Sequence, residues 1–172
     1  MEEEGIKVLL GVPDMKVHAK ICIIKKREFN KTTQYGFVST GNFNESTAQL
    51  YGDHLLLTTN KMILADVNRI FDCLEKPIIK LDSLKTCKTL IVAPNHMRRY
   101  FLNLLAKEIR FAKKKQHASV FLKLNSLVDH ELIEELYHAA RSGVEIHMII
   151  RGICCLKAEQ KSFKKDIHAI SI

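Results

Sequence analysis

The sequence contains no tryptophan, and no apolar run in it approaches the roughly 20 residues that cross a bilayer. Its first residues are acidic and lack the basic and apolar regions of a secretion signal. We therefore expect a protein of the cytoplasm, either free or at the membrane surface. Aromatic residues make up 7% of the chain, which is little material for stacking on nucleic-acid bases. The balance of 47% hydrophobic and 27% charged residues nevertheless predicts a folded globular protein.

The five cysteines are odd in number and include no C-x-x-C pair. This pattern fits neither a zinc site nor a set of disulfides, so we expect reduced thiols and no metal site built from them. The adjacent Cys154 and Cys155 could be reactive thiols, but such residues are more often small hydrophobic side chains near the end of a strand.

Positive charge is in excess and is distributed unevenly. The formal net charge is +8, and residues 87–172 contain 15 Lys and Arg against 8 Asp and Glu, whereas residues 1–86 contain 12 against 11. The basic half favours an anionic partner such as a nucleotide, polyphosphate, nucleic acid or a membrane surface. A solvated basic face without a specific partner is the other interpretation.

The first half of the chain is rich in short apolar runs separated by polar turns. Period and composition predict strands at 6–10, 17–24, 35–39 and 54–58, with a polar hairpin loop at 25–34. A short helical turn is expected at 46–51. An apolar stripe predicts a helix at 63–75, which Pro77 ends. Residues 76–88 are then expected to link two lobes.

The second half alternates between strand and helix patterns. Strands are predicted at 89–93, 119–124, 144–150 and 167–172, and helices at 97–114 and 130–141. Asp129 is expected to cap the second helix and Gly143 to end it. This alternation predicts an α/β layer with largely parallel strands.

His18 and Lys20 form an H-x-K pair on the strand predicted at 17–24. Because alternate residues of a strand share a face, the imidazole and the ammonium are expected side by side. An imidazole can attack phosphorus, and an ammonium can neutralise phosphate oxygens. The pair alone is weak evidence, since a single histidine on a strand is more often a hydrogen-bonded core residue.

The Gly41–Asn44 segment strengthens the interpretation of His18 as a phosphate-site residue. It offers a glycine turn, the carboxamides of Asn42 and Asn44, and backbone N–H groups that can bind phosphate oxygens. A turn that caps a following helix is the alternative. Together the two segments resemble the H-x-K…G-x-x-N half-site of the phospholipase D superfamily. One departure is that Lys25 stands where that signature has an aspartate.

A longer set of segments is similar to the bacterial type 1 polyphosphate kinases. These segments are Val17–Ile21, Val38–Glu45, Thr47–Ala48, Tyr51, Leu124–Asp129, Val144–Cys154 and Ile170–Ile172. The resemblance covers nearly the whole chain. It implies an α/β fold of phospholipase-D-like mixed sheets with flanking helices, in two partial lobes. Residues 1–80 would be part of the first lobe, and residues 81–172 most of the second, truncated at its C-terminal end.

The same resemblance implies reversible transfer of the ATP γ-phosphate to inorganic polyphosphate through a phosphohistidine. His18 then corresponds to the phosphorylated nucleophile, and Tyr51 and Arg151 to residues that contact ATP or ADP. Lys20, Asn42 and Asn44 match the motif, and we infer that they position phosphate. Mg²⁺ and a homo-oligomer are implied for the intact enzyme, and no nucleic-acid partner is expected.

Two parts of the family pattern are absent from the sequence. A second catalytic histidine follows Ile-Ser-Ile in that family, and the arginines near magnesium lie upstream of Met1. We therefore expect a fragment that holds no metal and is inactive alone, and His168 to be structural or solvent-exposed. Two alternatives remain open: a phospholipase-D-like phosphodiesterase or nuclease, and a non-catalytic basic module that binds nucleic acid.

Overall fold

The computed structural model describes residues 4–76 and 81–172. It divides into two compact units, Met1–Asn95 and His96–Ile172, which are described separately below. Within the described residues, no helix combines the length and the apolar character needed to span a membrane.

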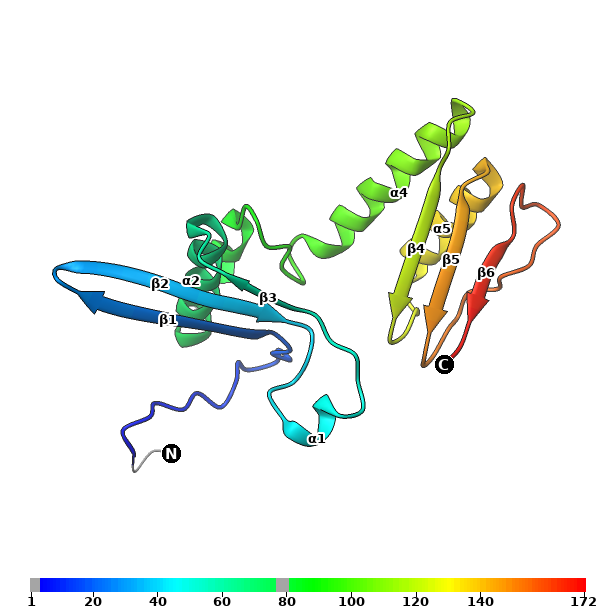
Figure 1. The fold of residues 1–172 in the computed structure, drawn as a ribbon. Helices are drawn as coiled ribbons and strands as arrows, with labels where there is room; N and C mark the ends of the chain where they lie inside the picture. The colour runs from blue at the N-terminus through cyan, green and yellow to red at the C-terminus, as the bar shows by residue number, and fades with distance from the viewer. Residues whose placement is uncertain (1–3, 77–80) are drawn as a thin grey trace. The chain divides into compact units, whose positions relative to one another are not determined.

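Unit 1 contains a three-stranded antiparallel sheet. Its strands are β1 (Lys20–Glu28), β2 (Lys31–Ser39) and β3 (Leu55–Thr58), in the order β1-β2-β3 (Figure 1). The β1–β2 hairpin turns at Phe29 and Asn30, both with positive φ, as a type I′ hairpin turn requires. The hairpin is paired along its whole length, from Lys20 opposite Ser39 to Glu28 opposite Lys31.

Three predictions for this unit are wrong. The expected loop at 25–34 is strand apart from its turn, because backbone hydrogen bonds pair the polar residues of the hairpin as well as its apolar ones. The strand expected at 17–24 begins only at Lys20, so His18 precedes it. Residues 6–10 form no strand and are solvent-exposed, since no neighbouring strand in the described part of the chain pairs with them.

Helix α2 (Lys61–Glu75) confirms the apolar stripe predicted for it and packs on the sheet of unit 1. The side-chain oxygen of Asn60 caps its start by accepting from the N–H groups of Met62 and Ile63. Leu64 and Val67 are buried on its inner face. Before β3 lies the short helix α1 (Glu45–Ala48), which begins one residue before the helical turn predicted at 46–51 and ends within it.

Asp66, on α2, is a buried carboxylate that binds the backbone of residues 88–90 near the end of unit 1. It accepts from the Thr89 hydroxyl and from the N–H groups of Lys88, Thr89 and Leu90, at 2.6 to 3.1 Å, and pairs with Arg69. Burial raises its pKa, but the hydrogen bonds from Thr89, Leu90 and Lys88 outweigh burial and lower the pKa from 3.8 to about 2.

This cluster also explains a failed prediction. Residues 89–93 form no strand, because amides at the start of the segment bind Asp66 instead of a neighbouring strand. In the predicted linker at 76–88, residues 81–86 form a 3₁₀ helix, η2 (Leu81–Thr86), and residues 77–80 lie outside the described residues.

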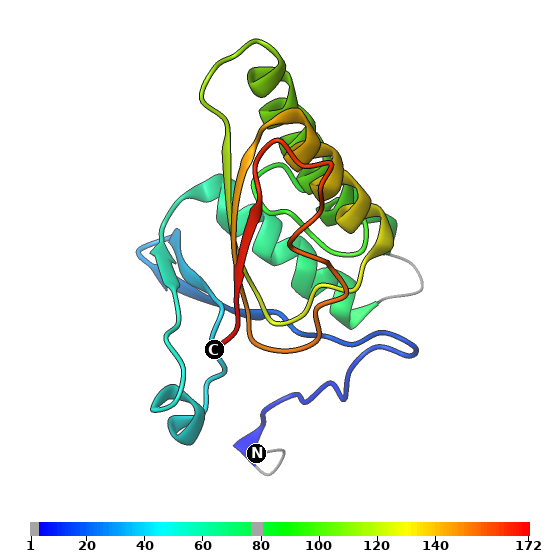
Figure 2. The ribbon, with the colours of Figure 1, turned by 90° about the vertical axis from the view of Figure 1, so that its right-hand side faces the viewer.

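Unit 2 is a parallel sheet with helices on one face. Its strands β4 (Ser119–Leu124), β5 (Glu145–Ile150) and β6 (Ile167–Ile170) lie in the order β4-β5-β6. Helices α4 (Met97–Lys113) and α5 (His130–Ser142) lie on one side of this sheet, seen edge-on in Figure 2. The predicted caps of α5 are confirmed: Asp129 accepts from the N–H of Leu132, and Gly143 is left-handed. The α/β fold class is thus confirmed.

The two faces of the second sheet differ in character. The helix-covered face is apolar, and alternate residues of β5 point into it: Ile146, Met148 and Ile150. On the open face, Phe121, His147 and His168 stack on neighbouring strands, with ring centroids 4.9 Å apart. His168 is exposed, as predicted.

Candidate functional site

His18 lies on an exposed segment that leads into β1. The Lys20 ammonium nitrogen is 3.1 Å from its Nδ1 and 3.2 Å from its Nε2, and also donates to the His18 carbonyl oxygen at 2.9 Å. The expected pairing of imidazole and ammonium is therefore present. Its cause differs from the one predicted, because the Lys20 side chain folds back onto a residue outside the strand. The imidazole is open to solvent and has a cation beside it.

The Gly41 turn begins where the β1–β2 pairing ends, at Lys20 opposite Ser39. The register therefore places this turn at the same end of the hairpin as His18. Thr40 closes the turn: its hydroxyl donates to Asp53 Oδ1 at 2.9 Å and accepts from the His54 N–H at 3.0 Å. A Cβ at Gly41 would lie 2.4 Å from Asp53 Oδ2, so this packing requires glycine.

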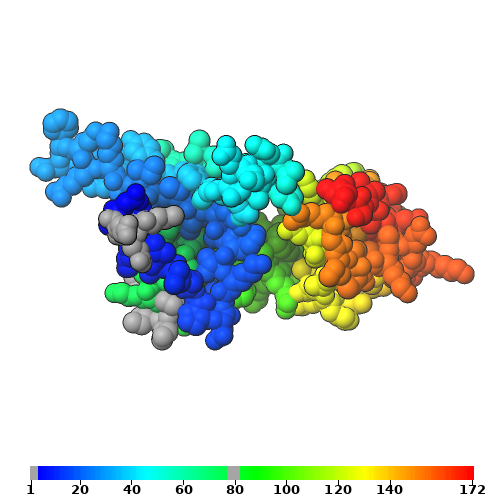
Figure 3. All heavy atoms as spheres, turned by 90° about the horizontal axis from the view of Figure 1, so that it is seen from below, coloured from blue at the N-terminus to red at the C-terminus, as the bar shows by residue number. Residues whose placement is uncertain are grey.

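The side chains of the turn have different surroundings. Asn44 caps α1, because its Oδ1 accepts from the Thr47 N–H at 3.1 Å. The carboxamide oxygen of Asn44 thus has the helix-capping role that was the alternative to phosphate binding. Phe43 packs edge-on against Phe37 of β2, with ring centroids 5.1 Å apart. Asn42 is exposed and Tyr51 is half-exposed, and both belong to the surface segment around α1 (Figure 3, cyan).

Arg151 belongs to unit 2, at the carboxyl end of β5. The last paired residues of β4 and β5 are Leu124 and Ile150, so Asn125 and Arg151 follow them side by side. The Arg151 Nε–H donates to Asn125 Oδ1 at 2.7 Å. In α/β sheets the carboxyl ends of parallel strands are the usual place for ligands, and a guanidinium suits phosphate.

Backbone hydrogen bonds join the two loops that carry these residues. The Leu127 N–H donates to the Ile153 carbonyl at 2.8 Å, and the Cys155 N–H donates to the Leu127 carbonyl at 3.0 Å. Gly152 lies against the other loop, where a Cβ would be 2.7 Å from the Asn125 carbonyl oxygen. The backbone around Arg151 is therefore fixed on both sides.

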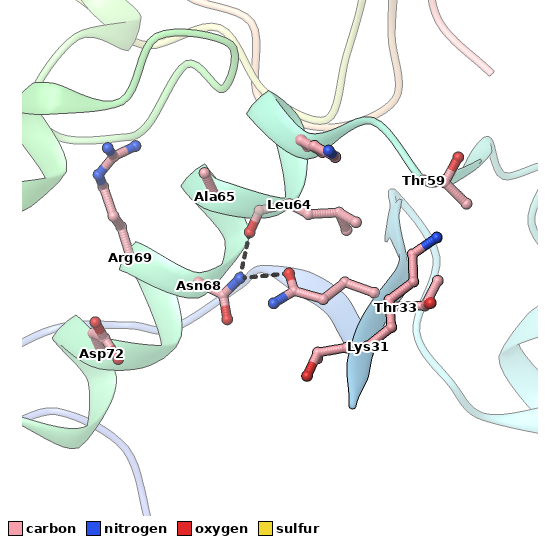
Figure 4. A pocket seen from close by; sticks show the side chains of 11 residues that line it. Lys31, Thr33, Thr59, Leu64, Ala65, Asn68, Arg69 and Asp72 are labelled. Atoms are coloured by element: carbon pink, nitrogen blue, oxygen red, sulfur yellow. Dashed lines mark hydrogen bonds between the residues drawn. The ribbon is translucent and has the colours of Figure 1, made fainter. Parts of the chain in front are cut away.

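Unit 1 has a cavity that none of the candidate residues lines. It measures about 760 Å³ and is lined by polar side chains of β2 and α2, among them Lys31, Asn68 and Asp72 (Figure 4). Asn68 spans it by donating to Gln34 Oε1 and to the Leu64 carbonyl. Residues 4–76 and 81–172 contain no group of three or more His, Cys, Asp or Glu side chains that could hold a metal ion.

Comparison with known proteins agrees with the resemblance seen in the sequence. The family model for polyphosphate kinase C-terminal domain 1 matches residues 1–80, and the one for C-terminal domain 2 matches residues 90–172. The chain belongs to the polyphosphate kinase family. It is 40% identical over 174 residues to the polyphosphate kinase of Vibrio cholerae, and 37% identical over 172 residues to that of Salmonella typhimurium. Each alignment covers all of this chain and 24% of the relative.

A solved polyphosphate kinase from Porphyromonas gingivalis has the same fold. It superposes with a TM-score of 0.80 at 34% identity, over 99% of this chain and 28% of that one. The chain thus spans about a quarter of the length of the polyphosphate kinases that it matches. These relatives favour neither the nuclease nor the nucleic-acid-binding alternative.

Sequence reasoning missed the residues that hold the candidate side chains in place. Thr40 and Asp53 fix the Gly41 turn, and Asn125 holds Arg151. Asn125 belongs to the Leu124–Asp129 segment, which is similar to the family. This similarity marks the segment, but it does not predict the hydrogen bond between Asn125 and Arg151. Asp53, in a Gly-Asp pair before a strand, resembles an ordinary turn residue.

Proposed function

We propose that the polypeptide containing residues 1–172 transfers the terminal phosphate of ATP reversibly to inorganic polyphosphate, with His18 as the phosphorylated nucleophile. The observation that carries this proposal is the exposed imidazole with the Lys20 ammonium within 3.2 Å of both ring nitrogens. Family membership supports the reaction class. Because the relatives are about four times longer than this chain, other segments would complete the catalytic site.

In the first step, a ring nitrogen of His18 attacks the γ-phosphorus of ATP. A P–N bond forms, the bond between the γ-phosphorus and its bridging oxygen to the β-phosphate breaks, and ADP leaves. An imidazole nitrogen that accepts from Lys20 does so through the lone pair that a nucleophile needs. The ammonium would therefore turn from the ring to a non-bridging phosphate oxygen, where it neutralises charge.

In the second step, a terminal oxygen of polyphosphate attacks the phosphorus on His18. The P–N bond breaks, a new P–O–P bond forms, and the polymer is one phosphate longer. The Gly41 N–H already donates to Ser39 Oγ at 3.0 Å. Asn42, Asn44 and the backbone amides that follow Gly41 would therefore hold the phosphate oxygens, as turn amides do in other anion sites. Tyr51 would stack on the nucleotide, and Arg151 would bind its phosphates in a planar fork.

In this proposal, magnesium is present only as the ion bound to ATP. Mg²⁺ prefers carboxylate oxygens, and the described residues offer no cluster that fits it. No step is therefore assigned to the metal. A homo-oligomer and a location in the cytoplasm or at the membrane surface stay predictions for the natural polypeptide.

Phosphorylation with γ-labelled ATP and Mg²⁺ tests the proposal in the natural polypeptide that contains residues 1–172. The label should be acid-labile and base-stable, as a P–N bond is, and His18→Ala should abolish it. Lys20→Ala should slow labelling about 100-fold, the typical effect of removing one group that stabilises developing charge. His117→Ala is the matched control, because this histidine is exposed in the other unit and should label normally.

Two results would contradict the proposal. One is equal labelling of the His18→Ala variant and the unmodified protein, which would exclude His18 as the nucleophile. The other is DNA or phosphodiester cleavage without nucleotide dependence, which would favour the phospholipase-D-like nuclease despite Lys25 at the position of the signature aspartate.

A further inference from the structure

Asn125 and Arg151 meet at the carboxyl ends of two adjacent parallel strands. A hydrogen bond of 2.7 Å joins them, from the Arg151 Nε–H to the Asn125 Oδ1. Both side chains are exposed, so this contact does not result from burial in the core. It restrains the direction of the Nε–H of an exposed guanidinium.

Hydrogen bonds restrain the backbone of the two loops that carry Asn125 and Arg151. The Arg151 N–H donates to the Leu124 carbonyl at 3.3 Å, and the Leu127–Ile153 and Leu127–Cys155 hydrogen bonds join the loops beyond it. Gly152 permits this approach, since any larger residue would clash with the Asn125 carbonyl oxygen. The positions of the two side chains are therefore set by the sheet.

The geometry and the charge of this contact both suit phosphate binding. A guanidinium has five N–H bonds in one plane, and fixing the Nε–H fixes the direction of the four on its terminal nitrogens. Those four are the donors that bind phosphate in a fork. A carboxylate at position 125 would hold the same geometry but would cancel the positive charge. A carboxamide oxygen orients the guanidinium without placing a negative charge beside it.

We infer that Asn125 is a positioning residue, which orients the Arg151 guanidinium for a phosphate group of the bound nucleotide. This inference rests on the proposed function, in which Arg151 contacts ATP. Asn125 touches no substrate atom in this account and acts only through Arg151. Pre-orienting the arginine removes part of the entropy cost of binding, so its effect appears in nucleotide affinity.

A double-mutant cycle on ATP affinity tests this inference in the natural polypeptide that contains these residues. Arg151→Ala should weaken ATP binding about 100-fold, and Asn125→Ala about tenfold. The double variant should bind within about twofold of Arg151→Ala alone, because Asn125 acts only through the arginine. Asn103→Ala, on the exposed surface of α4 in the same unit, is the matched control and should bind normally.

Each outcome of the cycle decides a different point. Losses that multiply in the double variant would overturn the inference, because Asn125 would then act independently of Arg151. Unchanged affinity in Arg151→Ala would instead overturn the proposed contact of Arg151 with ATP, and with it the role of Asn125.

A second variant separates geometry from charge. Asn125→Asp keeps an oxygen acceptor, so the Arg151 Nε–H signal in ¹⁵N spectra of the 172-residue chain should stay protected from exchange, whereas Asn125→Ala should lose that protection. ATP affinity in the Asn125→Asp variant should nevertheless fall at least tenfold, because the carboxylate neutralises the guanidinium. Affinity equal to that of the unmodified protein in this variant would overturn the inference that a neutral acceptor is required.

Discussion

The two units of this chain are stabilised in different ways. Unit 2 has a continuous apolar core between its parallel sheet and its helices, with Ile146 and Met148 at the centre. The buried apolar side chains of unit 1, among the described residues, are few: Leu64, Val67, Cys73 and Leu84. Beside them lies the charged Asp66, which is 1% exposed and fully hydrogen-bonded. One unit depends on packing, and the other depends heavily on one ionised group.

This difference extends to the candidate catalytic residues. Arg151 extends directly from a core strand, and its neighbour Asn125 extends from the next one, so the fold fixes both. His18 precedes its strand and is held by Lys20, two residues away. A nucleophile that must accept a phosphoryl group and release it can use such freedom, whereas an arginine that binds phosphate gains affinity from being fixed.

Truncating the core of unit 2 should have the largest effect. Ile146→Ala removes buried methyl groups from the centre of the sheet, and we expect a loss of about 4 kcal/mol in the free energy of unfolding. Amide hydrogen exchange read separately in the two units measures it, with Ile170→Ala on the exposed face as the matched control. An equal loss of protection in unit 1 would contradict the assignment of this core to unit 2.

Removing the buried carboxylate of unit 1 should have the next largest effect. Asp66→Ala leaves Arg69 and the amides of Lys88, Thr89 and Leu90 without their acceptor, and should cost about 3 kcal/mol by the same exchange measurement. The control is Asp82→Asn, which alters an exposed carboxylate that pairs only with Lys85 in the described contacts and should leave the exchange unchanged. Intact protection of residues 88–90 in Asp66→Ala would refute the role of this carboxylate.

Acid should weaken unit 1 through the same group. Because the pKa of Asp66 is lowered from 3.8 to about 2 on folding, its ionised form stabilises the unit above about pH 4, and this contribution disappears as the pH falls through about 2. The contribution is about 2 kcal/mol. Urea unfolding of the unmodified protein and Asp66→Asn at several pH values measures it as a difference that shrinks toward pH 2. A difference that is constant with pH would contradict it.

Changing the Gly41 turn should alter catalysis more than stability. In Gly41→Ala, the new Cβ must displace the Asp53 carboxylate and break its hydrogen bond with Thr40. We expect labelling of His18 by ATP to slow about tenfold, the effect of one lost hydrogen bond of about 1.4 kcal/mol. Gly52→Ala is the control, because nothing lies within 4 Å of its new Cβ. Equal rates in the two variants would show that the turn does not position phosphate.

Much of the fold could be predicted from the sequence, because its apolar periodicity is clear. The stripes of α2, α4 and α5 and the apolar strands β4 and β5 appear within about two residues of their predicted bounds. The length of the β1–β2 hairpin was underestimated, because its polar half is held by backbone hydrogen bonds that the apolar periodicity of the sequence does not reveal. The apolar run at 90–92 looks like a strand, but its neighbouring amides bind Asp66, 23 residues away in the case of Thr89.

The candidate residues were predictable by type, whereas their supports were not. His18, Lys20 and the Gly41 turn follow from local motifs. Asp53 and Asn125 act on residues 13 and 26 positions away, which only the folded chain brings into contact. A sequence without an alignment contains no local signal for such pairs.

Transfer of a preformed phosphoryl group tests the central claim most directly. The natural polypeptide containing residues 1–172 is labelled with γ-labelled ATP, freed of nucleotide, and mixed with unlabelled polyphosphate, and the labelled peptide is identified by mass spectrometry. We predict a label on the peptide that contains His18, and its movement to the polymer within the time of one turnover. A label on another residue, or one on His18 that polyphosphate fails to remove, would contradict the account.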